Sequence, residues 1–149
     1  LRYGKICILA DADSDGLHIA TLLCALFLRH YKSLVQDGRI YIAMPPLYRV
    51  DCGKEVLYAL DEIQKDKAVD DFKKKKGKPK INIQRFKGLG EMNPSQLRET
   101  VMDPNSRQLV RLSISATDNA NAMMDLLLSK KNAPARKEWL EKKGSLVRL

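Results

Sequence analysis

The sequence lacks any hydrophobic run long enough to cross a membrane. The longest apolar stretch, residues 19–28, stops at Arg29 and His30, whereas a transmembrane helix needs roughly 20 apolar residues. A signal-peptide pattern is also missing, so we expect a soluble, cytoplasmic protein with no membrane partner. The chain begins with Leu1 instead of methionine, and we therefore expect it to be part of a longer polypeptide.

Cysteine is scarce as well. The three cysteines, Cys7, Cys24 and Cys52, are odd in number, widely spaced and without a CxxC pair. Disulfide frameworks and zinc sites need paired or clustered cysteines, so the sequence favours neither. We interpret the three thiols as reduced and structural, with metal binding as the less favoured alternative.

Acidic residues are outnumbered by basic ones. Lysine and arginine total 27, aspartate and glutamate 18, and the net charge is +9 in 149 residues. Most of the excess lies in residues 73–80, which hold six lysines, and in the basic stretch from Lys130 onward. Such an excess favours an anionic partner, and DNA or RNA is the first candidate. A solvated loop is the alternative interpretation of the lysine run.

The hydrophobic pattern predicts an α/β fold. Residues 5–10 form an unbroken apolar run that is typical of a buried parallel strand. Residues 16–35 are apolar with helical periodicity, and residues 39–43 read as the next strand. Together they predict a β-α-β unit with a crossover helix.

The remaining residues are predicted to form shorter elements and one loop. Residues 61–80 are lysine-rich and weakly patterned, which predicts a mobile insertion. Residues 1–114 would form one α/β domain, and residues 115–149 a C-terminal helical tail. Further strands are expected at 47–50, 55–60, 81–86 and 107–114, with a hairpin turn at 51–54, and helices at 93–102, 118–128 and 135–142.

The strongest functional signal is the acidic string DADSDG at residues 11–16. It follows the first predicted strand, and open α/β folds place their sites at the carboxyl ends of parallel strands. If the backbone stays extended there, Asp11 and Asp13 point to the same side. Two carboxylates so close repel each other, and a bound Mg²⁺ ion would relieve that repulsion. We therefore predict a metal site at Asp11 and Asp13, with Asp15 as a third candidate ligand.

Two other interpretations of the acidic string compete with this one. A calcium-binding EF-hand would need glutamate where Leu22 stands, and a helix before the string instead of a strand, so that interpretation fails. A purely structural role stays open, because acidic residues stabilise the N-terminus of a helix. That role would explain Asp15 but leave Asp11 and Asp13 unexplained.

Four motifs, in order, carry a resemblance to a known family. They are DADSDGLHI at 11–19, PPLYR at 45–49, QRFKGLGEMNP at 84–94 and ETVMDP at 99–104. The series resembles the B subunits of bacterial type IIA DNA topoisomerases, and ARKEWL at 135–140 is similar to that family's closing helix. Arg98 stands where gyrase-like sequences usually carry tryptophan, and no large insertion is present. The sequence is therefore more similar to the topoisomerase IV branch than to gyrase.

The resemblance implies a Toprim domain, a Rossmann-like parallel sheet with flanking helices, over residues 1–114, without the family's first strand and catalytic glutamate motif. It implies that Asp11 and Asp13 are catalytic because they hold Mg²⁺, for which Mn²⁺ or Ca²⁺ can substitute. A tyrosine on the partner, the A subunit of topoisomerase IV, would then cleave DNA in an A₂B₂ heterotetramer. ATP would bind elsewhere in the full-length protein, and no GxxxxGK[ST] loop occurs here.

The resemblance also suggests His18, Lys87 and Arg136 as DNA contacts. His18 would lie in the first turn of its helix, where amide donors favour phosphate. The alternatives are a core histidine for His18, a tight glycine turn around Lys87, and a solvated surface arginine for Arg136. If the acidic residues Asp11, Asp13 and Asp15 are merely structural, the chain is a basic DNA-binding or subunit-docking module instead of part of a catalytic site.

Overall fold

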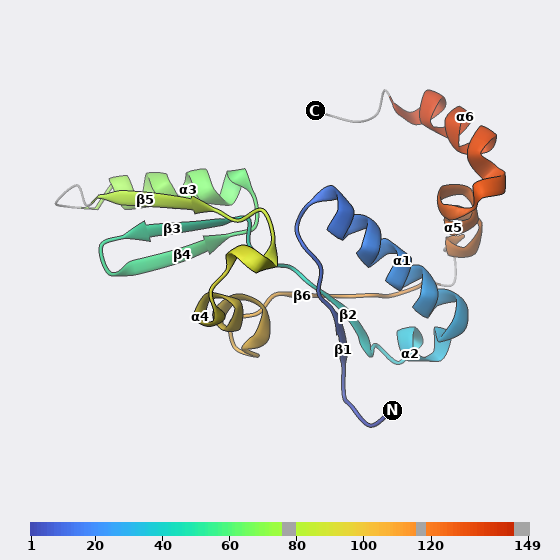
Figure 1. Cartoon of the computed structure of the whole chain (residues 1–149), viewed down its shortest axis with the longest axis horizontal. Coiled ribbons are helices and arrows are strands. Elements are labelled where there is room, and N and C mark those ends of the chain that lie inside the picture. Colours follow the sequence, from blue (N-terminus) through green and yellow to red (C-terminus); the bar gives the residue numbers. More distant parts are fainter. Residues whose placement is uncertain (76–79, 116–118, 145–149) are drawn as a thin grey trace.

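Two small three-stranded sheets organise the structure, with a helical pair at its C-terminal end (Figure 1). The computed structural model describes residues 1–75, 80–115 and 119–144. The predicted α/β class is confirmed to the extent that the described residues form both helices and strands, mixed along the chain. In the described ranges, no helix combines the length and apolar character that a membrane span requires.

The first sheet contains β1 (Ile6–Ile8), β2 (Ile40–Ala43) and β6 (Leu109–Arg111), with β2 in the middle. β1 and β2 run parallel, with Ile6 aligned with Ile40, whereas β6 is antiparallel to β2. The β-α-β unit predicted from the sequence is thus confirmed. Of the fully parallel sheet that the resemblance implies, the described residues form only this one pair.

The crossover between β1 and β2 consists of two helices, α1 (Ser14–His30) and α2 (Lys32–Gln36). The single helix predicted over residues 16–35 is wrong at this point, because Tyr31 has a non-helical backbone (φ −134°, ψ 42°) that separates them. α1 packs on the sheet through one buried side. The core of this half contains Ile8, Ala20, Cys24, Leu28, Val35 and Ile40.

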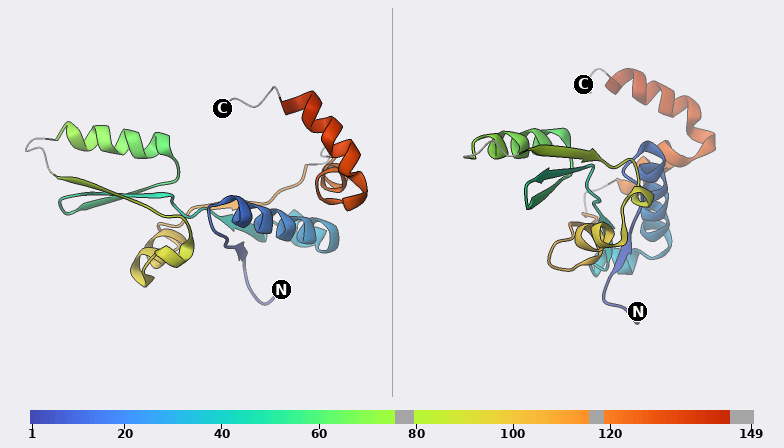
Figure 2. Two further views of the ribbon diagram at one scale, coloured as in Figure 1. Left: turned by 45° about the horizontal axis from the view of Figure 1, so that its top comes forward. Right: turned by 60° about the vertical axis from the view of Figure 1, so that its left-hand side comes forward.

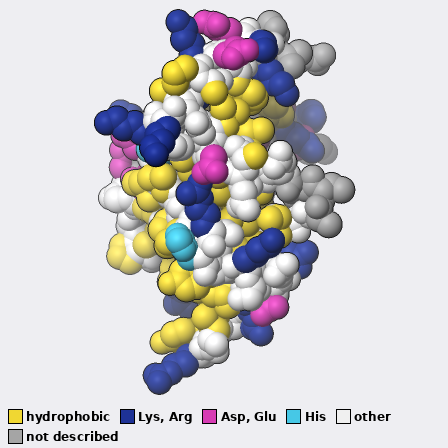
Figure 3. All heavy atoms as spheres, turned by 90° about the vertical axis from the view of Figure 1, so that its right-hand side faces the viewer, with side chains coloured by type: hydrophobic (Ala, Val, Ile, Leu, Met, Phe, Trp, Pro, Cys, Tyr) yellow, Lys and Arg dark blue, Asp and Glu magenta, His cyan; other side chains and the backbone are white. Residues whose placement is uncertain are grey.

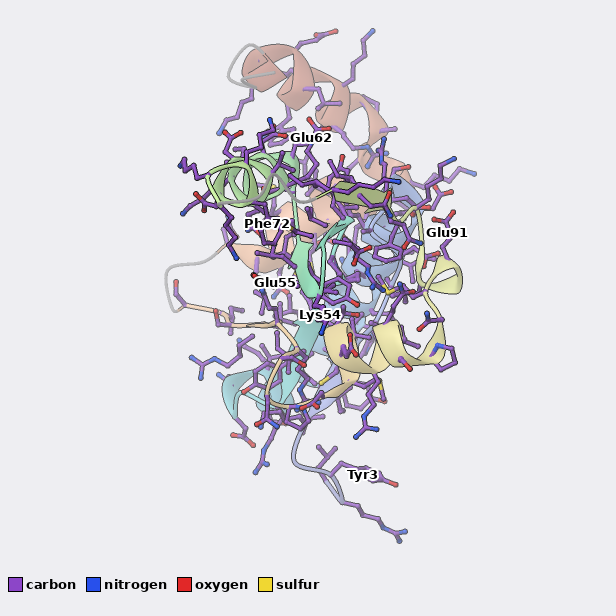
Figure 4. The ribbon with its side chains drawn as sticks, turned by 90° about the vertical axis from the view of Figure 1, so that its left-hand side faces the viewer. Tyr3, Lys54, Glu55, Glu62, Phe72 and Glu91 are labelled. Carbon is purple, nitrogen blue, oxygen red and sulfur yellow. The ribbon has the colours of Figure 1, made fainter. Side chains whose placement is uncertain are left out.

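The second sheet is antiparallel and contains β3 (Tyr48–Cys52), β4 (Glu55–Ala59) and β5 (Ile81–Arg85), with β3 in the middle. The hairpin predicted between β3 and β4 is confirmed. Its turn requires a residue with positive φ, which Gly53 supplies at 63°. Lys54 and Glu55 lie at this hairpin, on the side of the molecule that faces the viewer in Figure 4.

Helix α3 (Glu62–Lys73) covers one face of the second sheet, so the mobile insertion predicted here is wrong for this stretch (Figure 2). Asp61 begins the helix by accepting a hydrogen bond of 2.8 Å from an amide of the first turn. Ala68 and Phe72 are buried against the sheet. Residues 76–79, the rest of the lysine run, lie outside the described residues.

The segment after β5 leads back to the first sheet. It forms a 3₁₀ turn, η1 (Leu89–Glu91), then α4 (Pro94–Leu97) and a π-helical turn, η2 (Arg98–Met102). Asn93 and Gln96 make a reciprocal capping box, with hydrogen bonds of 2.9 and 3.0 Å, that begins α4. The helix predicted here is confirmed, although its second half is π-helical.

A helical pair lies at the C-terminal end, as predicted for the tail. It consists of α5 (Ala120–Leu128), the 3₁₀ turn η3 (Lys130–Asn132) and α6 (Ala133–Lys143). The pair lies beyond α1, on the far side from the second sheet (Figure 2). An ion pair between Arg29 and Asp125 joins α1 to α5. Hydrophobic side chains are exposed among basic ones over this end of the molecule (Figure 3).

Candidate functional site

Asp11 lies in the loop between β1 and α1, at the carboxyl edge of the parallel pair. Its Oδ1 accepts a hydrogen bond of 2.8 Å from the backbone amide of Leu89, which is 78 residues away in the sequence. Gly88 lies against the same carboxylate, because a Cβ at this glycine would be only 3.1 Å from Asp11 Oδ1. The glycine-rich loop before α4 therefore holds the exposed Asp11 side chain in place.

Asp13 is the N-cap of α1. Its Oδ1 accepts a hydrogen bond of 2.7 Å from the amide of Gly16, which satisfies a free donor of the first turn. Gly16 must be glycine because a Cβ there would lie 2.0 Å from the carbonyl oxygen of Asp11. Asp15 lies in the first turn, where its negative charge interacts favourably with the helix dipole. Asp13 therefore also has a structural role, as the cap of α1, which the sequence argument had missed.

The three aspartates are the candidate metal ligands predicted from the sequence. Asp11 and Asp13 each use Oδ1 for a backbone hydrogen bond, and within the described residues Oδ2 of neither accepts one. No group of three or more His, Cys, Asp or Glu side chains suited to a metal ion occurs in that part of the chain. Mg²⁺ is commonly bound by one or two carboxylates with waters and substrate phosphates. The pair is therefore compatible with an open magnesium site that a phosphate would complete, and Asp15 does not close it into a protein cage.

His18 and Lys87 are both exposed, as a DNA contact requires. The exposure of His18 argues against the core-histidine alternative. Because α1 begins at Ser14, His18 lies two residues further into the helix than predicted, beyond most of the free amide donors. The backbone amide of Lys87 donates a hydrogen bond of 2.8 Å to Glu91 Oε2, which closes the loop on itself. Glu91 lies at the η1 turn (Figure 4).

Arg136 has a role that the sequence did not suggest. Its Nη1 donates hydrogen bonds to the carbonyl oxygens of Leu126 and Leu127, both 2.9 Å, and of Ser129, 3.3 Å. These carbonyls end α5 and have no partner within that helix. Arg136 therefore caps α5, which lies next to the C-terminal half of α1. Asp11 precedes the N-terminus of α1, at the opposite end of that helix. A phosphate contact by Arg136 stays a prediction.

A polar cluster on the open face of the second sheet was missed by the sequence argument. Arg49 forms an ion pair of 2.8 Å with Asp51, and their hydrogen bond raises the pKa of Arg49. Tyr58 lies opposite Arg49 in the strand register and donates a hydrogen bond of 3.1 Å to Glu99 on η2. Burial, followed by the hydrogen bond to Glu99, raises the pKa of Tyr58. The alternation of residues along the predicted hairpin was the only available signal for this cluster.

Comparisons with known proteins decide the family. The family profile described as "DNA gyrase B subunit, carboxyl terminus" matches residues 78–141. The B subunit of DNA topoisomerase 4 from Salmonella typhimurium is 65% identical over 151 residues, which cover 100% of this chain and 24% of that protein. The chain belongs to the B-subunit family of type IIA DNA topoisomerases.

Two further relatives show which branch the chain resembles. The B subunit of DNA topoisomerase 4 from Escherichia coli K12 is 62% identical, again over 100% of this chain and 24% of the relative. The B subunit of DNA gyrase from Thermotoga maritima is 44% identical over 99% of this chain and 22% of the relative. The predicted likeness to the topoisomerase IV branch is thus confirmed. The chain spans about a quarter of the length of these relatives.

Proposed function

We propose that this chain is the Toprim portion of the B subunit of an ATP-dependent topoisomerase IV and supplies the carboxylates that hold Mg²⁺ for DNA cleavage and religation. The partner A subunit would supply the tyrosine, in an A₂B₂ assembly that decatenates and relaxes DNA. One observation carries the proposal: Asp11 and Asp13 occupy the loop at the carboxyl edge of the β1/β2 pair. That location is where open α/β folds bind their ligands.

In this proposal the two carboxylates contribute charge and position. Asp11 is oriented by the Leu89 amide, and Asp13 by the start of α1, so that the second oxygen of each is available to a cation. Mg²⁺ bound there supplies positive charge that stabilises the oxygen leaving the scissile phosphate. Neither aspartate has to transfer a proton.

DNA would be held through its backbone. His18 and Lys87 are both exposed. His18 follows the Asp11 loop in the sequence, and Lys87 lies on the loop whose Leu89 amide bonds Asp11. Contacts of this kind are made to phosphates and do not depend on base sequence. Binding by the assembled enzyme should therefore weaken steeply as salt concentration rises. Arg136 is the least favoured of the three candidates, because its guanidinium already bonds α5.

The test is cleavage by the intact two-subunit enzyme carrying Asp11→Asn or Asp13→Asn. Asparagine keeps the oxygen that accepts each backbone hydrogen bond but removes the charge that holds a cation. We expect Mg²⁺-dependent DNA cleavage to be lost while assembly of the tetramer and DNA binding remain. Asp37→Asn, at the exposed end of α2, is the matched control. Cleavage that is unchanged in both variants would refute the proposal.

The second candidate function is a DNA-binding or subunit-docking module whose acids are structural. It is favoured by the finding that Asp11 and Asp13 both accept backbone hydrogen bonds. Under this alternative both asparagine variants cleave normally. The corresponding part of a gyrase is the alternative within the family, and a supercoiling assay of the assembled enzyme separates it from topoisomerase IV.

A further inference from the structure

The Asp11 carboxylate is in contact with the loop that precedes α4. A Cβ at Gly88 would lie 3.1 Å from Asp11 Cγ and Oδ1 and 3.2 Å from Oδ2, closer than ordinary van der Waals contact. The backbone of Gly88 is extended, with φ −163° and ψ 170°, so any residue could adopt its conformation. The carboxylate of Asp11 is therefore the group that a side chain at this position would crowd and displace.

The loop that makes this contact is fixed at both ends. Phe86 and Met92 are buried, with exposed fractions of 2% and 9%. The Phe86 amide donates a hydrogen bond of 2.8 Å to the carbonyl of Leu47. Between these anchors, Glu91 Oε2 accepts the amide of Lys87 at 2.8 Å. The Leu89 amide consequently points at Asp11 from a closed turn.

We propose that Gly88 and Glu91 are positioning residues for Asp11. Glu91 closes the loop so that the Leu89 amide is aimed at Asp11 Oδ1, and Gly88 allows the backbone to come close enough to bond. Asp11 Oδ2 is then presented to a cation in one orientation. The inference rests on the proposed function of Asp11 as a metal ligand. Groups that orient a ligand contribute to affinity because small misplacements weaken coordination.

The first test is Gly88→Ala in the full-length protein, in complex with its partner. The added methyl group pushes the Asp11 carboxylate aside by a few tenths of an ångström. We expect Mn²⁺ to bind about tenfold more weakly, measured by electron paramagnetic resonance. The Mg²⁺ concentration for half-maximal cleavage should rise similarly, with a smaller change in maximal cleavage. Gly90→Ala is the matched control, because no atom lies within 4 Å of its added Cβ.

The second test changes Glu91, which does not touch Asp11. Glu91→Ala removes the acceptor of the Lys87 amide, and we expect Mn²⁺ binding to weaken several-fold. Glu91→Gln keeps an oxygen in the same place and should restore binding to nearly that of the unmodified protein. A defect in Glu91→Gln as large as that in Glu91→Ala would overturn the inference, since charge and not loop closure would then be responsible. The Glu91 pair decides the outcome if Gly88→Ala does not fold.

Asp11→Asn separates this inference from the proposed function. If Asp11→Asn leaves Mn²⁺ binding and cleavage unchanged, Asp11 is no ligand, and both proposals fall. If Asp11→Asn abolishes binding but Gly88→Ala and Glu91→Ala behave as Gly90→Ala does, only the positioning role is refuted. Weakened binding in all three variants, with Gly90→Ala and Glu91→Gln intact, supports it.

Discussion

Tyr58 on β4 and Glu99 on η2 are joined by a hydrogen bond of 3.1 Å between the phenol and the carboxylate. This bond fastens the second sheet to the segment that contains η1 and α4. The same segment begins with the loop that contacts Asp11. The open face of the second sheet is thus linked, through one continuous stretch of chain, to the candidate metal site.

Replacement of Tyr58 by phenylalanine should lower stability slightly, in a pH-dependent way. Only the neutral phenol donates to Glu99, and its pKa is raised in the folded protein, chiefly by burial and then by this bond. The contribution is therefore present below about pH 10, the ordinary tyrosine pKa, and is lost as pH rises through the folded value. We expect Tyr58→Phe to cost about 0.5–1 kcal/mol at pH 8.

Urea unfolding of both proteins between pH 8 and pH 11 measures the effect. The difference in free energy of unfolding should shrink toward zero as the pH increases. Comparison of the two proteins cancels the titration of lysines, which they share. A difference that grows with pH would contradict the assigned direction of the Tyr58 pKa shift.

Much of the fold could be predicted because its signals are local. The apolar run before Asp11 and the turn at Gly53 each determine a nearby element, and both are where the sequence placed them. Helix α3 was missed because its buried side consists only of Ala68, Val69 and Phe72 among lysines and acids. So small an apolar stripe gives little periodicity, and the helix depends on the sheet that it covers.

Asp13 should show a cap effect that is separable from its role toward metal. Its Oδ1 accepts the Gly16 amide at 2.7 Å, a bond that alanine cannot make and asparagine can. We expect Asp13→Ala to lower the free energy of unfolding by about 1 kcal/mol, and Asp13→Asn by much less. Urea unfolding checks the order of the variants. Equal losses in both would show that charge, and not capping, makes Asp13 stabilising.

The three cysteines should differ in reactivity toward iodoacetamide. Cys7 is exposed, whereas Cys24 and Cys52 are buried. Burial also raises the pKa of Cys24, so less of it is in the reactive thiolate form near pH 8. We expect Cys7 to be alkylated at least about tenfold faster than Cys24 in the folded protein. Peptide mapping by mass spectrometry gives the three rates, and similar rates under native conditions would contradict the burial described here.

The candidate site shows where sequence reasoning stops. Asp11 and Asp13 could be singled out because alternating carboxylates after a strand are rare and chemically specific. The cap on α1 was missed because the helix was placed two residues late, at residue 16 instead of Ser14. The bond from the Leu89 amide to Asp11 joins positions 78 apart and uses a backbone donor, for which no residue type is a signal.

Arg136 offers the clearest test of a residue whose predicted and observed roles differ. Its guanidinium bonds three carbonyl oxygens at the end of α5, and alanine would remove this donor from all three, leaving Ser129 with only the 3.1 Å bond from the Asn132 amide. A hydrogen bond from a charged donor contributes about 1.5 kcal/mol, which corresponds to roughly tenfold in an opening equilibrium. We expect Arg136→Ala to speed hydrogen exchange in α5 by about that factor.

Lys137→Ala is the matched control for Arg136→Ala, because it removes the same charge from the next position of α6. Lys137 forms its ion pair with Glu141, on its own helix. Its loss should therefore not change exchange in α5, and both variants should reduce DNA affinity by a similar, small amount. If Arg136→Ala instead leaves exchange unchanged and lowers the salt dependence of DNA binding by about one phosphate contact more than Lys137→Ala, Arg136 binds DNA and the capping role is wrong.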